Sequence, residues 1–315
     1  MLYNKNMMSL CNQETGIMKN YARSFMVEIG FDEEATESLC HDLNKILSHP
    51  EAGKIWEECL NAYETDMHHD YLHALHRAKE AGELAGVHEY SAHMLLVVCY
   101  SKRLRELYRE NGIADSIWFD SMCDLKWKLW ECQVVKGIHG SFVGGWFGGF
   151  FNLTRFALGR LQFELIDFNQ NYEKDGHVLS PGDKVINMHI PRTLTPFSPE
   201  NCNDSFAKAA EFFRDRLKGA PVVFHCSSWL LSDIHYKILH EKSNVRRFMD
   251  RFDILQFTYE PEGEHRNAWR IFDMDFTGNY DDYPEDSFIR KAYKTYMKDG
   301  GITGGGRGIF FYDCI

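Results

Sequence analysis

Several features of secreted, membrane-spanning or disordered proteins are scarce in these 315 residues. Proline is rare, with 8 residues, and apolar residues make up 44% of the chain, a balance that excludes disorder and collagen-like repeats. No run of about 18 apolar residues occurs, and the N-terminal stretch lacks the apolar segment of a signal peptide. We therefore expect a compact cytoplasmic protein without a membrane span.

Paired cysteines and basic charge are also in short supply. The nine cysteines are an odd number, are widely scattered and form no CxxC pair, which indicates reduced thiols. Lys and Arg number 35 against 46 Asp and Glu, a net charge of −11. A field of this sign repels phosphate backbones and anionic lipid, so it argues against nucleic acid and membrane partners. The oligomeric state stays open.

The sequence divides into two parts that differ in residue pattern. Up to about residue 135 the chain has one proline, Pro50, and an apolar spacing of three and four residues that is typical of helices. The segment 137–151 then combines six glycines with aromatic residues, and we place the domain boundary at its start. The predicted domains are 1–136, all helical, and 137–315. The predicted helices are 18–29, 33–47, 51–64, 68–84, 88–110 and 115–135.

Beyond this boundary short β-branched and aromatic runs alternate with helical segments. The order predicts a mixed α/β domain whose sheet has a parallel pair across the first helix and a hairpin at the end. The predicted strands are 158–168, 184–190, 221–227, 252–258 and 268–274, and the predicted helices are 203–218, 232–239 and 286–298.

Five phrases in this order resemble a bacterial family of acyltransferase-domain proteins. They are LGRLQFEL (158–165), VINMHIP (185–191), SPENCNDSFAKAAEFF (198–213), SSWLL (227–231) and SNVRRFMDRFDIL (243–255). The resemblance implies a helical N-acyltransferase N-terminal domain followed by a C-terminal domain similar to GNAT-type N-acetyltransferases, an α/β (α+β) fold.

The implied activity is transfer of an acyl group, expected to be acetyl, from acetyl-CoA or another acyl-CoA to an amine or hydroxyl. The acceptor would be a small molecule or peptide, and the acidic balance favours a cationic or neutral one. The alternative is a non-catalytic binding or regulatory module that keeps the fold and lacks the coenzyme A cradle. It is favoured by one departure from the family, because no Q/R-x-x-G-x-G/A motif follows Ile190.

Anion binding without those glycines is the expectation for the segment that follows. Arg192 adds a fixed positive charge, and Asn203 or Asp204 is predicted to cap a helix whose amides suit a phosphate. Together with Ile190 and Thr193, these residues form the predicted coenzyme A loop. Ser228, at the end of another predicted strand, is expected to cap the next helix or contact the ligand.

The segment GGITGGGRG (300–308) could in principle cradle phosphate through successive amides. It does not lie between a strand and a helix, which P-loop and dinucleotide motifs require. We interpret it as a flexible turn before a final strand.

Strand alternation places Arg160, Gln162 and Glu164 on one face. Acyl transfer to an amine needs a base, and Glu164, its pKa raised by partial burial, is the first candidate. The alternative is an exposed face on which Arg160 and Glu164 form a weak ion pair. His189 is the second candidate base, against a structural histidine at a strand end. The resemblance implies Tyr236 as the proton donor to the leaving thiolate.

Two further motifs favour structural interpretations. Cys226 and His225 are strand neighbours that point to opposite faces, so a buried thiol is favoured over a nucleophile. His69, His73 and His76 share a helical face, but without an HExxH glutamate or a nearby cysteine we expect a solvated or interfacial face and no metal.

Overall fold

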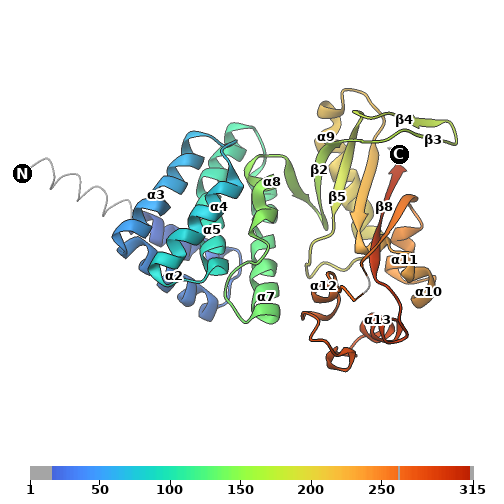
Figure 1. Cartoon of the computed structure of the whole chain (residues 1–315). Helices are drawn as coiled ribbons and strands as arrows, with labels where there is room; N and C mark the ends of the chain where they lie inside the picture. Colours follow the sequence, from blue (N-terminus) through green and yellow to red (C-terminus); the bar gives the residue numbers. More distant parts are fainter. Residues whose placement is uncertain (1–15, 262, 313–315) are drawn as a thin grey trace, which may run out of the picture. The chain divides into compact units, whose positions relative to one another are not determined.

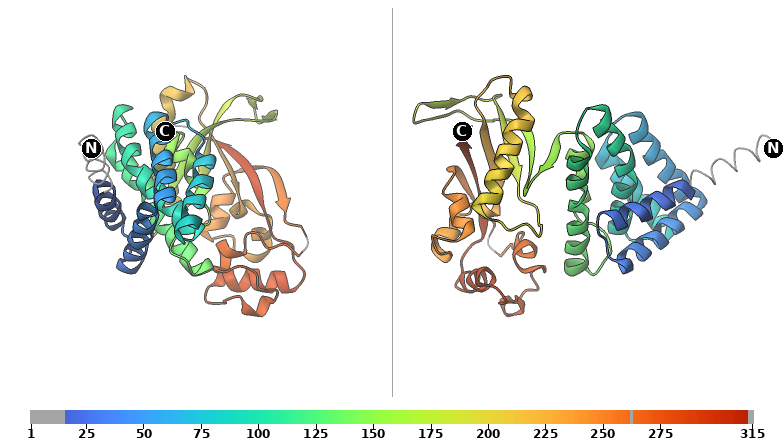
Figure 2. Two further views of the ribbon diagram at one scale, coloured as in Figure 1. Left: turned by 60° about the vertical axis from the view of Figure 1, so that its left-hand side comes forward. Right: turned by 180° about the vertical axis from the view of Figure 1, so that it is seen from behind.

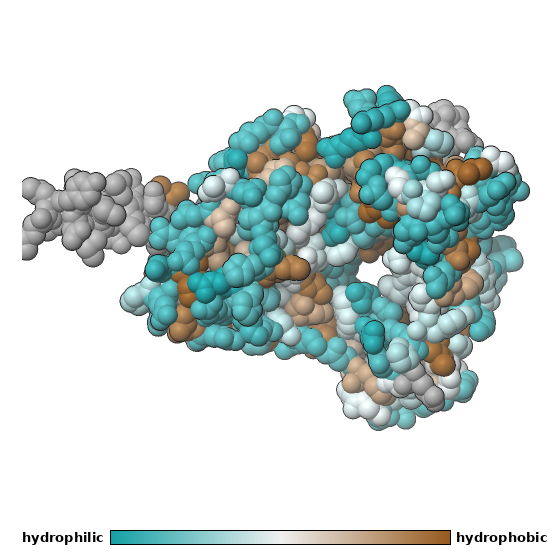
Figure 3. Space-filling view, turned by 45° about the horizontal axis from the view of Figure 1, so that its top comes forward, coloured by the Kyte–Doolittle hydropathy of each residue, from teal (hydrophilic) through white to brown (hydrophobic). Residues whose placement is uncertain are grey.

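The structure, a computed structural model, describes residues 16–261 and 263–312 (Figure 1). The chain divides into two compact units, residues 1–154 and 155–315. Among the described residues, no helix is both long and apolar enough to cross a membrane. In the space-filling view hydrophilic side chains cover most of the visible surface of each unit, and hydrophobic ones form separate small patches (Figure 3).

The first unit is helical, as the periodicity predicts. A helix over 16–28 precedes the others, and the boundaries agree with the predicted ones to within a few residues, except that the last predicted helix is two helices that join at Cys123. The remaining helices are α2 (Glu33–Ser48), α3 (Pro50–Thr65), α4 (Tyr71–Ala85), α5 (Glu89–Glu110), α6 (Asp115–Met122), α7 (Asp124–Lys136), the short 3₁₀ helix η1 (Gly144–Phe147) and α8 (Gly148–Phe151).

The Gly/aromatic segment belongs to this helical unit. Ser141 donates its backbone N–H to the carbonyl of Tyr90 at 2.9 Å, and the Tyr71 hydroxyl donates to the carbonyl of Gly144 at 2.8 Å. A Cβ on Gly140 would lie 2.4 Å from the Tyr90 carbonyl carbon, so the close approach requires glycine. The chain therefore divides after residue 154 and not at 136, because these contacts hold the segment against α4 and α5.

The second unit is built on a six-stranded sheet with the order β1-β2-β5-β6-β8-β7. β5 and β6 are parallel, which confirms the parallel pair predicted across the intervening helix, and the other neighbours are antiparallel. β3 and β4 form a separate hairpin that the sequence did not predict. The strands are β1 (Arg155–Leu158), β2 (Leu161–Asp167), β3 (Tyr172–Lys174), β4 (His177–Leu179), β5 (Lys184–His189), β6 (Val223–Ser228), β7 (Asp253–Tyr259) and β8 (Gly304–Phe311).

The two faces of this sheet differ in chemistry. One face is aromatic and is covered by α9 (Pro199–Leu217), whose Phe206 packs against Phe163 and Phe224 (Figure 2). On the opposite face an apolar cluster that includes Val185 and Val223 lies where β5 and β6 begin. Toward the other end of these strands the same face is polar, and the candidate site lies there.

Short helices complete the second unit. They are the 3₁₀ helix η2 (Trp229–Leu231), α10 (Ile234–Ile238), α11 (Asn244–Met249), α12 (Ala268–Phe272), the 3₁₀ helix η3 (Tyr280–Asp282) and α13 (Phe288–Lys298). Of these, α10 and α13 fall in predicted helices. The strand predicted over 268–274 is wrong, because this short apolar run forms α12 and buries Ile271 and Phe272 against Tyr283 and Tyr293. The strand predicted over 158–168 corresponds to β2, and the turn at Gly159 separates it from β1, of which only Leu158 falls in the predicted range.

The glycine-rich segment near the C-terminus forms strand β8 from Gly304 onward, so the prediction of a flexible turn there is wrong. A Cβ on Gly306 would lie 2.3 Å from the carbonyl oxygen of Leu231, and one on Gly304 would lie 2.0 Å from that of Thr258. The glycines therefore let neighbouring backbone approach the strand closely.

Candidate active site

A hydrogen-bonded network crosses the polar face of the sheet. The Glu164 carboxylate on β2 accepts from His189 Nε2 on β5 at 2.6 Å and from Asn187 Nδ2 at 3.1 Å. Arg155 on β1 donates to both carboxylate oxygens, at 3.0 and 3.3 Å. The side chains of Glu164 and His189 are 15% and 20% exposed, so the pair is sheltered and still reachable. The structure thus brings together the two candidate bases.

The electrostatics of Glu164 differ from the expectation. Burial acts to raise the pKa of this carboxyl, but the hydrogen bond from His189 and the charge of Arg155 outweigh it and lower the pKa to about 2. The predicted raised pKa is therefore wrong in direction. A carboxylate of this kind stays ionised near pH 7 and is a weak base, but it can orient His189 and stabilise its protonated form. Glu164 pairs with Arg155, and not with Arg160 as the alternative had it.

Asn187 and His225 extend the network and fix its orientation. His225 Nδ1 lies 2.8 Å from Asn187 Oδ1, so the ring donates and the amide nitrogen of Asn187 faces Glu164. Burial, then the charges of Arg307 and His189, lower the pKa of His225 to about 4, which keeps it neutral. Because His189 Nε2–H donates to the carboxylate, Nδ1 carries the lone pair and is the atom that can accept a proton.

The parallel strands part beside this network. β5 and β6 are in register only from Ile186 to Met188, although β5 continues to His189 and β6 to Ser228. Beyond these pairs the two strand ends do not hydrogen-bond to each other as a ladder. In open α/β sheets, ligands bind at the carboxyl ends of such strands. His189 stands at this opening.

Two family models match the chain. Residues 20–153 match an N-acyltransferase N-terminal domain, and residues 155–310 match a GNAT-like C-terminal domain. The chain belongs to this two-domain acyltransferase family. No curated protein matches it in sequence.

Solved structures share its fold at low identity. An acyltransferase in complex with decanoyl-CoA and teicoplanin has a TM-score of 0.71 at 19% identity, and an acyltransferase in complex with CoA and 10C-teicoplanin has 0.72 at 20%. An acyltransferase mutant in complex with octanoyl-CoA has 0.72 at 19%. In each case the alignment covers 93% of this chain and 88% of the other.

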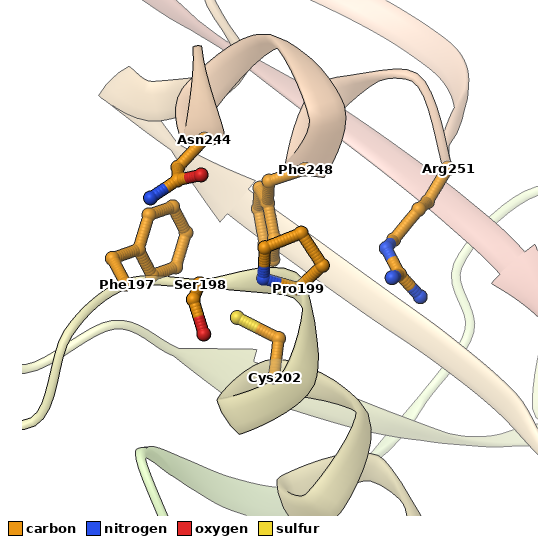
Figure 4. Close-up of a pocket in the computed structure, with 7 residues that line it drawn as sticks. All are labelled: Phe197, Ser198, Pro199, Cys202, Asn244, Phe248 and Arg251. Atoms are coloured by element: carbon orange, nitrogen blue, oxygen red, sulfur yellow. The ribbon is translucent and has the colours of Figure 1, made fainter. Parts of the chain in front are cut away.

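In the GNAT-like domain the helix after β5 begins earlier than predicted. Ser198 is its N-cap and accepts the N–H of Asn201 at 3.4 Å, with Pro199 at the first helical position. Asn203 and Asp204 therefore lie inside α9 and cap nothing. Seven residues line a small pocket at the start of α9. One of them is Arg251, whose side chain lies at the edge of the pocket (Figure 4). The other six are Phe197, Ser198, Pro199, Cys202, Asn244 and Phe248.

An ion pair of Arg192 holds the loop between β5 and α9 in place. Arg192 Nη2 lies 2.5 Å from Asp273 Oδ1, and Arg290 pairs with the other oxygen of the same carboxylate. Thr193 accepts the N–H of Thr195 at 2.9 Å, which shapes the loop after Ile190. The predicted charge is present, but an acidic partner neutralises it.

The remaining candidates have structural contacts. Ser228 caps η2 by accepting the N–H of Leu230 at 3.1 Å, as one of the two predicted roles requires. The guanidinium of Arg246 lies 4.4 Å from the ring centre of Tyr236, which is 44% exposed. Cys226 is fully buried and burial raises its pKa to about 12, in agreement with an inert thiol.

The three predicted histidines do not share one helix, because His73 and His76 are in α4 whereas His69 precedes the helix and its N-cap Asp70. His69 Nδ1 contacts the carbonyl of Asp66 at 3.1 Å, and its Nε2 contacts the Tyr100 hydroxyl. Within 16–261 and 263–312, no three His, Cys, Asp or Glu side chains are placed to hold a metal ion.

Sequence reasoning missed Arg155 and the role of His225. Arg155 precedes the first predicted strand, and only the β1–β2 register places it opposite Glu164. The sequence offers His225 only as a neighbour of Cys226, whereas the sheet register pairs it with Asn187. The periodicity of one strand carries no such cross-strand signal.

Proposed function

We propose that the chain transfers an acyl group from a coenzyme A thioester to an amine or hydroxyl acceptor. The observation that carries this proposal is the His189–Glu164 pair at the point where β5 and β6 part. A base at the opening between two strand ends can contact a thioester that binds there. The acyl-CoA complexes of proteins with the same fold support this donor.

In the proposed reaction the acceptor nitrogen or oxygen attacks the thioester carbonyl carbon. Its proton passes to Nδ1 of His189, and the ionised Glu164 stabilises the imidazolium that forms. The new C–N or C–O bond replaces the C–S bond, and the leaving thiolate takes up one proton. Tyr236 remains our predicted donor of that proton, with His189 as the other source.

Donor binding would use the loop 190–195 and the pocket at the start of α9. The pocket offers the positive charge of Arg251, and Ser228 stands at the end of β6 on the other side of the strand opening. The sequence predicts an acetyl donor, whereas the proteins of similar fold bind decanoyl and octanoyl chains. Acetyl-CoA and decanoyl-CoA are therefore compared directly in the test below.

A second candidate function is a binding or regulatory module without coenzyme A. It is favoured by the chemistry of the α9 start, where the Glu200 carboxylate accepts from its own backbone N–H and from the Ser198 hydroxyl, contacts that lower its pKa. A negative charge at this position competes with a phosphate for the helix amides. The pairing of Arg192 with Asp273 favours the same alternative.

Isothermal titration calorimetry with decanoyl-CoA, acetyl-CoA and free CoA decides between the two functions. We expect binding of at least one thioester, weakened in Arg251→Ala and strengthened in Glu200→Gln. Lys208→Ala, on the exposed side of α9, is the matched control and should leave the affinity unchanged. An absence of heat and of thermal shift at millimolar ligand would contradict transfer from coenzyme A and leave the module or another acyl carrier.

A further inference from the structure

One cation on the polar face has neutral partners only. Arg307 on β8 donates from Nη1 to Asn169 Oδ1 at 3.2 Å and from Nη2 to Gln170 Oε1 at 2.5 Å. Throughout the part of the chain that the structure describes, no carboxylate forms an ion pair with it. Two hydrogen bonds use two of the five N–H donors of a guanidinium. Arg192, Arg155 and Arg290 differ, because each of them faces a carboxylate.

The sheet register places Arg307 in one row with the candidate base. His189 is opposite Gln162 on β2, and on β6 Ser227 directly follows Cys226, which is the partner of Met188, the residue before His189. Ser227 is in turn opposite Arg307, and Arg307 is opposite Gln256. These residues share one face, since cross-strand partners point to the same side. The charge of Arg307 also contributes to the low pKa of His225, which shows that its field reaches the network.

The surroundings leave part of the guanidinium accessible: Arg307 is half-buried, and its Nε is buried without a hydrogen-bond partner among the described residues. Ser227 and Gln256, its neighbours on either side, are both exposed. Arg307 and His189 stand two strands apart, about 10 Å between backbones at ordinary strand spacing. Their side chains can therefore reach two groups of one small molecule.

We propose that Arg307 binds an anionic group, such as a carboxylate, on the acyl acceptor whose amine or hydroxyl faces His189. This inference rests on the proposed acyl transfer and specifies its acceptor class. An arginine held by amide oxygens keeps its full charge, and its remaining N–H donors can bind a carboxylate. The negative net charge of −11 favours cationic or neutral acceptors at long range, but the local charge decides at contact distance.

The test measures binding of matched acceptor probes to the full chain saturated with CoA. The probes are glycine, β-alanine, 4-aminobutyrate and 6-aminohexanoate, each compared with its amide by saturation-transfer NMR. We expect at least one acid to bind five or more times tighter than its amide. Arg307→Gln should abolish this preference and leave the affinity for decanoyl-CoA unchanged.

A second variant protects the test against misfolding. Gln170→Glu keeps Arg307 and places a carboxylate where its amide partner stands, so it should also abolish the preference for the acid. Glu173→Gln, on the exposed hairpin strand β3, is the matched control and should retain it.

Three results would overturn the inference. The first is equal binding of acids and amides by the unmodified protein, and the second is a preference for the acid that survives both variants. The third is a loss of CoA affinity in Arg307→Gln, which would show that Arg307 binds a donor phosphate. Failure of the proposed function itself is separate, because it appears as the absence of binding of both decanoyl-CoA and acetyl-CoA.

Discussion

At the scale of single residues, the proposed mechanism depends on whether His189 or Glu164 takes the proton of the acceptor. Glu164 is ionised with a pKa of about 2, and His189 donates to it through Nε2. We expect His189→Gln to lower kcat for acyl transfer by about 10²- to 10⁴-fold, the usual contribution of a general base. Decanoyl-CoA affinity should stay unchanged.

Comparison of Glu164→Gln with His189→Gln identifies which of the two groups is the base. The Glu164 substitution keeps the shape of the side chain and removes the charge that orients the imidazole, so we expect a smaller loss in kcat than for His189→Gln. Steady-state kinetics of both variants, with melting curves to check their folding, make the comparison. A larger loss in Glu164→Gln would identify the carboxylate as the base.

His225 makes a prediction about stability and pH. Its pKa is about 4 in the folded chain and about 6.5 in an unfolded one. The unfolded state therefore takes up a proton first as the pH falls, and the stability that neutral His225 contributes above pH 6.5 is lost between pH 6.5 and 4. The shift corresponds to about 3 kcal/mol.

Urea unfolding of His225→Gln at several pH values checks this sign. The difference in unfolding free energy between wild type and variant should shrink as the pH falls from 6.5 to 4. His235 also has a pKa of about 4 and remains in both proteins, so its contribution cancels. A difference that is constant with pH would contradict the assignment.

At the scale of elements, one carboxylate joins the β5–α9 loop to α12 and α13. Asp273 pairs with Arg192 and Arg290 from the left-handed backbone position that ends α12, a conformation that asparagine also tolerates. Asp273→Asn should therefore leave the backbone in place and lower the free energy of unfolding by about 1.5–3 kcal/mol, the range for hydrogen bonds to charged groups. Thermal or urea unfolding measures it.

The matched control for Asp273 is on the same network. Asp286 pairs with Arg290 at 2.8 Å, but its side chain is 62% exposed. Asp286→Asn should cost about 0–1 kcal/mol, as exposed ion pairs do. Equal losses in the two variants would show that burial does not set the strength of the Asp273 contacts.

Strand β8 gives a steric prediction. Gly306→Ala should lower the free energy of unfolding by about 1–3 kcal/mol or more, because its Cβ would collide with the Leu231 carbonyl. Gly145→Ala is the control, since its Cβ would meet only Leu72 at an ordinary 3.5 Å. Equal melting temperatures for both variants would exclude the close approach.

The helices and strands also show which features can be predicted from the sequence alone. Periodicity predicts most helices, because long repeated patterns are specific, and the strand–helix–strand order predicts the parallel β5–β6 pair. The Ser198-Pro199 start of α9 is a helix signal that was present and overlooked in favour of Asn203. The strand predicted over 268–274 failed because a short apolar run fits a buried helix equally well. The pairing of Arg155 with Glu164 depends on strand register, which local patterns do not encode.

At the scale of the whole molecule, the number of reactive thiols tests the prediction that the cysteines are reduced. All seven that the structure describes are free thiols, and five of them are buried. Protein unfolded without reductant should therefore react with at least seven equivalents of a thiol reagent. Under native conditions Cys40 and Cys123, which are only half-buried, should react before the five buried thiols, because burial blocks access of the reagent. A lower total would reveal a disulfide.

The strand order has a consequence for synthesis on the ribosome. β8 lies between β6 and β7, yet it follows both of them in the chain. While the polypeptide grows, these two strands are therefore complete before the strand that joins them, and both present open edges. Open edges can pair with other chains. The interval between translation of Tyr259 and of Phe311 is thus the period when the nascent sheet is most exposed to aggregation.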